Sequence, residues 1–388
     1  MNRKDFFKNS LLTAAGLVMA PGLMAGKQGK ASFFRLREIN GHWWFITPGG
    51  EKFWSIGINH IDSATLRYEE SGNIWEDRYD NSMKKWLEQV KKDIGSWNFN
   101  SVGWVQEVVT RELENHRHSR SFTFEEYQWL DMPYGHMLPV IDSDQWEVEV
   151  KLPDVRSKSF SEWVEYVARD ECVRLKDDPK LMGYFYVDCP VWIHTIPDND
   201  WRGSLLDPDM EKTEVGRKEM HDIATAYYKT LHDTIRRYDK NHLIFGDRYE
   251  LNRPISKIVL MAARPYVDAF CFQCFKDPVP LYNDLKYWAD ILKMPVFIAD
   301  SSRTMNNEPE GQVHGRPFRM HDTQKYEQTL NLIREIPECI GFHLCGAYAQ
   351  NFVRRSGLKN HQEKEGEETL EITRINEEMQ RWGSNQSL

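Results

Sequence analysis

Positive charge is in short supply in this sequence, and the shortage excludes one class of partner. The chain has 388 residues, of which 50 are Lys or Arg and 59 are Asp or Glu, giving a net charge of −9. Proteins that bind nucleic acid rely on Lys and Arg to neutralise phosphates, and nothing here indicates a basic groove. No G-x-G-x-x-G or Walker motif follows a predicted strand. We therefore expect no nucleic-acid partner and no cofactor.

Cysteine is also scarce, with six in the chain. Most lie in apolar runs that are predicted strands, and Cys271 and Cys274 would point to opposite sides of one strand, so they cannot pair with each other. We expect buried thiols rather than a disulfide framework. A zinc site at these two cysteines is the alternative, but no second pair lies at usable spacing, so we predict no metal site.

An apolar run long enough to span a membrane is missing. Residues 11–24 are apolar but contain Pro21, and Arg3, Lys4 and Lys8 precede them. This pattern is typical of a secretory signal peptide and is similar to a twin-arginine signal with Lys4 at the second arginine. We expect residues 1–31 to hold an export signal that is cleaved after Ala25 or after Ala31, and the protein to be exported to the periplasm or beyond, without membrane insertion after cleavage. A buried N-terminal helix is the alternative.

Aromatic residues, in contrast, are abundant. The chain has 14 Trp, and 13% of its residues are aromatic. Hydrophobic cores explain most such rings, but sugar-binding sites also use flat aromatic faces. The excess slightly favours a carbohydrate partner.

The mature chain, residues 32–388, has the pattern of one (β/α)8 barrel. Residues 33–52 are predicted to form a β-hairpin, and residues 363–382 a final packing helix. Most of the intervals between the apolar runs have helical periodicity, most clearly residues 160–175. Eight strands alternating with helices predict a closed parallel barrel whose site is built from the loops after the strands. The eight apolar runs are residues 53–59, 99–104, 136–140, 183–187, 242–245, 267–272, 295–299 and 340–344.

Polar and aromatic residues follow almost every predicted strand. Asp188 after the fourth strand and Asp300 after the seventh would face each other across the ring, and we predict them as the catalytic carboxylates of a glycosidase. Histidines at other strand ends could orient them. The predicted substrate-binding residues are Asn59, His60, Trp104, Glu107, His136, Trp192, His194, Asp247, Arg248, Gln273, Arg303 and His343.

Several motifs in the same order resemble agarase-like glycoside hydrolases of the retaining barrel clan, family 50 type. They are G-H-W-W-F-I-T-P-G-G at 41–50 with F-W-S-I-G-I-N at 53–59, L-K-D-D-P at 175–179, R-Y-D-K-N-H-L at 237–243, G-D-R-Y at 246–249 and P-Y-V-D at 265–268. The resemblance covers nearly the whole mature chain. It implies a (β/α)8 fold, a poly- or oligosaccharide substrate and hydrolysis of O-glycosidic bonds, with a galactan suggested by analogy.

The departures from that family fall on its catalytic positions. Its fourth strand resembles Val-Asp-Asn-Glu, with Glu as acid/base, whereas this chain has Asp188, Cys189 and Pro190 after Val187. Its seventh strand ends in a nucleophilic Glu, where this chain has Asp300. Asp188 would lie one layer deeper in the barrel than the family's Glu, and Asp300 is one methylene shorter than Glu. Both changes widen the gap between the two carboxyl groups beyond the roughly 5–5.5 Å of retaining enzymes, so we expect inversion, or another non-retaining chemistry, if the chain is hydrolytic.

Two other functions are compatible with the sequence. Loss of both glutamates would leave a barrel that binds glycan without cleaving it, although Asp at both positions favours an enzyme. The second is a non-hydrolytic lyase or isomerase, in which histidines and Asp188 hold a metal. No two of the histidines that would bind this metal lie at ligand spacing on one helix or strand, which weakens this alternative. They would be His60, His136, His194 and His343.

Overall fold

The structure is a computed structural model that describes most of the chain from residue 33 onward. The described residues are 33–110, 117–141, 154–193, 207–305, 312–313, 316–317, 319–346, 348–350 and 354–385. The predicted signal peptide and His194 lie outside them.

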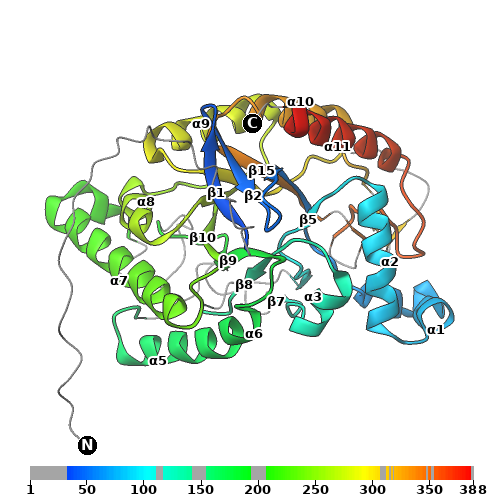
Figure 1. The fold of residues 1–388 in the computed structure, drawn as a ribbon, viewed down its shortest axis with the longest axis horizontal. Coiled ribbons are helices and arrows are strands. Elements are labelled where there is room, and N and C mark those ends of the chain that lie inside the picture. Colours follow the sequence, from blue (N-terminus) through cyan, green and yellow to red (C-terminus); the bar gives the residue numbers. More distant parts are fainter. Residues whose placement is uncertain are drawn as a thin grey trace, which may run out of the picture. The chain divides into compact units, whose positions relative to one another are not determined.

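Eight parallel strands close into a barrel, which confirms the predicted fold class (Figure 1). Each strand pairs in parallel with its two neighbours, and the last of them, β15, pairs with the first, β4. The strands are β4 (Ser55–Ile58), β5 (Ser101–Val102), β8 (Tyr134–Met137), β9 (Leu181–Asp188), β10 (Leu243–Glu250), β11 (Phe270–Gln273), β12 (Val296–Ser301) and β15 (Cys339–Leu344).

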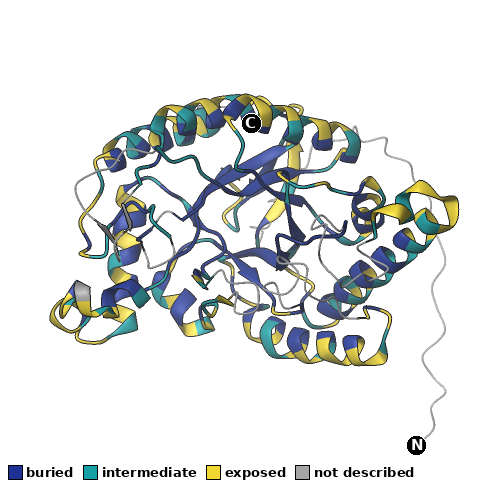
Figure 2. Cartoon of the chain, turned by 180° about the vertical axis from the view of Figure 1, so that it is seen from behind, coloured by how far each residue is buried: buried dark blue, intermediate teal, exposed yellow. Residues whose placement is uncertain are grey.

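Helices surround this barrel, with their buried faces inward and their exposed faces outward (Figure 2). They are α1 (Ile74–Tyr79), α2 (Met83–Ser96), α3 (Phe124–Leu130), α5 (Lys158–Val167), α6 (Val173–Leu175), α7 (Glu214–Tyr238), α8 (Lys257–Ala263), α9 (Pro278–Leu292), α10 (Thr323–Ile333) and α11 (Glu368–Asn385). None of the described helices combines the length and hydropathy needed to cross a bilayer.

Shorter elements decorate the connections. A π-helical segment, Ala168–Cys172, joins α5 to α6. Single 3₁₀ turns lie at Ala64–Arg67, Glu69–Ser71, Pro208–Lys212 and Arg264–Tyr266, and two small hairpins are formed by β6 (Val108–Thr110) with β7 (Arg117–His118) and by β13 (Gln312–Val313) with β14 (Arg316–Pro317).

An antiparallel sheet closes the N-terminal end of the barrel. It consists of β1 (Arg35–Ile39), β2 (His42–Ile46) and β3 (Lys52–Phe53), and β1 and β2 cross in front of the barrel strands in Figure 1. Asn40 and Gly41 form the turn with φ of 53° and 80°, the backbone that an Asn-Gly hairpin turn requires. The Phe45 ring packs 6.0 Å from the ring of Phe245 inside the barrel.

Aromatic side chains fill the barrel interior above this sheet. The ring centres of Phe185 and Phe245 are 5.1 Å apart, and those of Phe245 and Phe297 are 5.4 Å apart. All three rings are buried in one cluster. The barrel interior is therefore packed and leaves no room for a ligand between these rings.

Strand β10 changes its register just before that end. Gly246 has a φ of 68°, and the pairing of β10 with β9 shifts on either side of it. This bulge breaks the alternation of side chains. Phe245 packs inside the barrel, Asp247 faces the helices, and Arg248 again faces the interior.

Asp247 is buried against α7. Its carboxylate accepts hydrogen bonds from Tyr227 (2.9 Å) and Tyr228 (2.6 Å). Burial raises the pKa of Asp247 to about 7, although the two hydroxyls oppose the shift. The folded state thus binds a proton that the unfolded chain has already released above pH about 4.

The substitution Asp247→Asn should remove a pH-dependent loss of stability. Because the folded-state pKa is raised, this carboxyl lowers the free energy of unfolding as pH rises from about 4 to about 7. We expect the variant to match wild type near pH 4 and to gain on the order of 2–4 kcal/mol by pH 8. Denaturant unfolding at several pH values measures this, with Glu88→Gln on the exposed face of α2 as control. A difference that stays constant with pH would contradict the assignment.

Candidate active site

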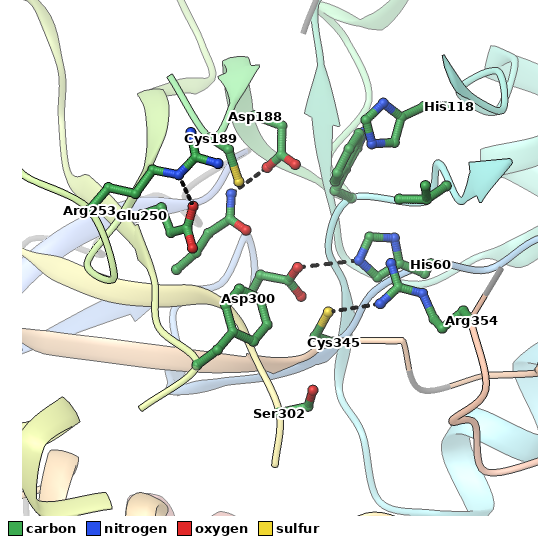
Figure 3. A pocket seen from close by; sticks show the side chains of 14 residues that line it. His60, His118, Asp188, Cys189, Glu250, Arg253, Asp300, Ser302, Cys345 and Arg354 are labelled. Carbon is green, nitrogen blue, oxygen red and sulfur yellow. Dashed lines mark hydrogen bonds and ion pairs between the residues drawn. The ribbon is translucent and has the colours of Figure 1, made fainter. Parts of the chain in front are cut away.

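A pocket opens at the C-terminal ends of the barrel strands, where barrel enzymes carry their chemistry (Figure 3). Its volume is about 390 Å³. The residues that line it are His60, Trp104, Val108, His118, Asp188, Cys189, Glu250, Arg253, Gln273, Phe275, Asp300, Ser302, Cys345 and Arg354.

One guanidinium lies beneath the pocket and holds both predicted catalytic carboxylates. Arg248 Nη1 donates to Asp188 Oδ1 (2.6 Å), and Nη2 lies 3.7 Å from Asp300 Oδ2. Nη2 also donates to the carbonyl of Ala299 (2.9 Å), and the guanidinium carbon lies 4.8 Å from the centre of the Trp104 ring. The side chain of Arg248 is fully buried. A buried charge of this kind is stable only when it is paired, so the three side chains form one electrostatic unit.

Asp188 acts as a hydrogen-bond acceptor in this unit. Its Oδ1 accepts from Arg248 and also from the side-chain amide of Gln273 at the end of β11. Both partners are donors, which favours the ionised carboxylate. The next residue, Cys189, has a φ of 41°, and its backbone N–H donates to the carbonyl of Arg248 (3.1 Å). A left-handed backbone at a residue other than glycine is a strain that clusters at functional sites.

Asp300 is held ionised on the opposite side of Arg248. Asn59 Nδ2 donates to Asp300 Oδ1 (2.5 Å), and His60 Nε2 lies 3.2 Å from Oδ2. Burial alone would raise the pKa of Asp300, but His60, Arg248 and Arg354 together hold it well below its usual range. The pocket therefore contains a buried negative charge at neutral pH.

His60 is in direct contact with Asp300. His60 Nδ1 lies 2.6 Å from the carbonyl of Gln106, which can only accept, so Nδ1 carries a hydrogen. Nε2 faces Asp300 Oδ2, and an ionised carboxylate also only accepts. The second contact is favourable only when Nε2 is protonated too. His60 has a φ of 59°, a second strained backbone in the pocket wall.

Arg354 and Cys345 complete the wall beside His60 (Figure 3). Arg354 Nε donates to Glu107 Oε1 (2.6 Å), and Nη1 donates to Cys345 Sγ (3.2 Å). Burial raises the pKa of the Cys345 thiol well above its ordinary value, so the group is a neutral thiol. Glu107 does not line the pocket itself, but it contacts two residues that do, Arg354 and His60, whose Nδ1 lies 4.0 Å from Glu107 Oε1.

Among the described residues, His60, Asp300 and Cys345 have ligand atoms within 4.8 Å of one another. These residue types can bind a transition metal. The guanidinium groups of Arg248 and Arg354 lie against Asp300 and Cys345, however, and the thiol is protonated. The residues present therefore disfavour a metal ion. The six cysteines, all of which lie in the described part of the chain, are buried and form no disulfide.

Three predicted substrate-binding residues point away from the pocket, to the helical side of the barrel. His136 contacts the Tyr127 hydroxyl (3.3 Å) and Glu171 (3.4 Å). Asp247 faces α7, and the Trp192 ring packs 5.6 Å from Tyr227 on the same helix.

Two others lie close to the pocket without lining it. His343 is inside the barrel below it, where Nε2 lies 2.8 Å from Ser55 Oγ and burial lowers its pKa to about 3. A Cβ at Gly57 or Gly103 would overlap its ring. Arg303 sits behind the rim, with Nη1 donating to the carbonyl of Phe275 (2.7 Å).

The structure thus brings together Asn59, His60, Trp104, Asp188, Arg248, Gln273 and Asp300 from the predicted set. Residues that the sequence analysis did not select also line the pocket. Cys345 stands directly after the end of β15, so a wider window around each strand end would have found it. His118 lies on the small hairpin β6–β7, for which the barrel pattern carries no signal.

The substitution Arg248→Met should destabilise the fold by about 3–5 kcal/mol, because it leaves two buried carboxylates without their shared cation. Adding Asp188→Asn should recover part of that loss, since it removes one of the unpaired charges. Denaturant unfolding of the single and double variants measures both effects, with Arg37→Met on the exposed side of β1 as control. A double variant less stable than Arg248→Met alone would contradict the coupling.

No protein-family model and no curated protein sequence matches the chain. Solved structures do. The crystal structure of an agarase superposes with a TM-score of 0.68 at 16% identity, covering 92% of this chain and 65% of that one. An exo-β-agarase gives 0.67 at 14% identity, with the same coverage. A β-glucuronidase from Bacteroides uniformis gives 0.54 at 11% identity, covering 88% of this chain and 37% of that one.

The chain therefore spans about 65% of the length of the two agarases. At these identities the likeness shows a shared fold. This chain has the same barrel fold as these agarases.

Proposed function

We propose that the chain is an exported glycoside hydrolase that cleaves O-glycosidic bonds of a poly- or oligosaccharide. One observation carries the proposal. An ionised, buried Asp300 contacts His60 at the edge of a pocket, and a second carboxylate, Asp188, stands on the other side of the same guanidinium. Such a pocket holds both a base and a proton, which glycoside hydrolysis requires.

The protonation states favour particular roles for these groups. Asp188 accepts only, so it is suited to take a proton from an attacking water. The His60–Asp300 pair carries the proton that the leaving oxygen needs. Asp300 would orient the imidazole through the 3.2 Å contact between its Oδ2 and His60 Nε2. Arg248 would keep the two carboxylates apart and prevent Asp188 from capturing that proton.

Aromatic side chains are suited to hold the sugar. Trp104 packs over Arg248 and lies 4.7 Å, centre to centre, from the ring of His118, so its orientation is fixed. Phe275 also lines the pocket. A volume of about 390 Å³ falls within the range of small-molecule sites. The agarases with the same fold favour a galactan as substrate.

A glycan-binding barrel without hydrolysis is the second candidate. It is favoured by the engagement of Asp188 with both Arg248 and Gln273, which leaves no protonated carboxylate on β9. In that case the pocket would bind sugar in wild type and in every variant, and no bond would break.

The substitutions Asp188→Asn and Asp300→Asn should each lower hydrolysis by about 10²–10⁴-fold while sugar binding persists. The measurement is release of reducing ends by residues 32–388 from agarose, other galactans and their oligosaccharides, with calorimetric binding on the same samples. Asp247→Asn is the matched control, because Asp247 is an equally buried aspartate outside the pocket. Binding without cleavage in all proteins, wild type included, would establish the glycan-binding alternative.

His60→Gln separates the proton-donating role from a structural one. The variant should lose activity on natural glycosides but keep it on aryl glycosides whose leaving group needs no proton. Equal loss on both substrates would reject the role of His60 as donor.

Product analysis should reveal inversion at the anomeric carbon. In the proposed roles Asp188 activates a water and no carboxylate attacks the sugar, so a single displacement at the anomeric carbon inverts it. Proton NMR of the first products, before mutarotation, measures the anomer. A retained anomer would contradict the two-aspartate mechanism.

A further inference from the structure

We propose that a second cavity, at the N-terminal end of the barrel, binds acidic saccharides through their sulfate or carboxylate groups. The cavity has a volume of about 490 Å³ and lies between the β1–β2 hairpin and the residues that precede or begin β10, β11 and β12. The candidate active site lies at the opposite ends of these strands. The two sites are therefore separate.

The cavity gathers positive charge in a chain that is negative overall. Arg35, Arg236, Lys240 and Lys293 line it, against one carboxylate, Asp268. The chain as a whole carries a net charge of −9. A local excess of cations on an acidic protein attracts anions to that place.

The single carboxylate is already engaged. Asp268 Oδ2 accepts from Arg236 Nη2 (2.9 Å) and from the backbone N–H of Ile244 (2.7 Å). Arg35 and Lys240 are exposed and form no ion pair within the described part of the chain, and Lys293 lies 3.5 Å from Asp290 on the surface of α9. Three cationic side chains thus remain able to contact a ligand.

An aromatic ring provides the second element of saccharide recognition. Trp43 on β2 lines the cavity and is half-buried, and its side chain packs against the buried cluster that includes Phe45, which holds it in place. Flat aromatic faces bind the apolar faces of sugar rings. Cations next to a fixed tryptophan match a sugar that carries an anionic substituent.

Other occupants fit this cavity less well. The chain segment before Phe33 contains Lys27 and Lys30 and no acidic residue after Asp5, so it does not complement a cationic site. A long polynucleotide would be repelled by the remaining acidic surface. The inference does not depend on cleavage at the active site, because it concerns binding alone.

Binding of sulfated galactan oligosaccharides, polyuronate oligosaccharides and neutral agaro-oligosaccharides to residues 32–388 tests the proposal. We expect the acidic ligands to bind with salt-dependent affinity. The variant Lys240→Glu/Lys293→Glu should bind them at least about tenfold more weakly than wild type. Trp43→Ala should also weaken this binding. Binding of neutral oligosaccharides at the active site should stay unchanged.

The matched control is Lys84→Glu/Lys257→Glu, which makes the same charge change on α2 and α8, with melting curves to establish folding. A similar loss of affinity in the control would overturn the proposal in favour of non-specific attraction. Equal affinity for single-stranded DNA would indicate a general polyanion site. Binding of inorganic sulfate with no added affinity from the sugar would reduce the cavity to a simple anion site. Which acidic ligand binds more tightly distinguishes sulfate from carboxylate recognition.

Discussion

The contact between Arg248 and its two aspartates is the constraint on which the site depends. The guanidinium is fully buried, and it binds side chains from β9 and β12 while it belongs to β10. Burying this cation without partners would lower the free energy of unfolding by several kcal/mol. The strands are therefore stable in this register only with Asp188 and Asp300 next to the guanidinium. The same contact that stabilises the end of the barrel thereby fixes the positions of the carboxylates that the pocket uses.

The bulge at Gly246 makes this contact possible. Without it, strict alternation after Phe245 would turn Asp247 inward and Arg248 toward the helices. Gly246 adopts a left-handed backbone and the pairing with β9 shifts at the same place, so Arg248 enters the barrel and Asp247 meets the tyrosines of α7. Irregular register also occurs between β11 and β12 near Gln273 and Asp300. Local departures from regular strands therefore direct these polar side chains into the pocket.

These bulges also mark the limit of what the sequence could predict. Eight apolar runs separated by helical periodicity were sufficient for the barrel, and strand ends were sufficient to collect Asn59, His60, Asp188 and Asp300. The sequence did not indicate which side chains of a strand point into the barrel, because both sides of a parallel barrel strand are buried and apolar. His136 was selected for its place near a strand end, yet it points to the helices. Asp247 was misplaced for the same reason, since a bulge leaves no mark in an apolar pattern beyond a glycine.

Environment rather than residue type decides which histidine can serve the pocket. His343 lies in the packed interior, where burial lowers its pKa to about 3 and keeps it neutral. His136 is engaged with Glu171 on the helical side. His60 alone among these three has a carbonyl on one nitrogen and an ionised carboxylate on the other, an arrangement that requires two ring protons. His60 would thus present a proton beside an open pocket, while Arg248 keeps Asp188 ionised on the other side of its guanidinium. A barrel that only binds sugar would not need this arrangement.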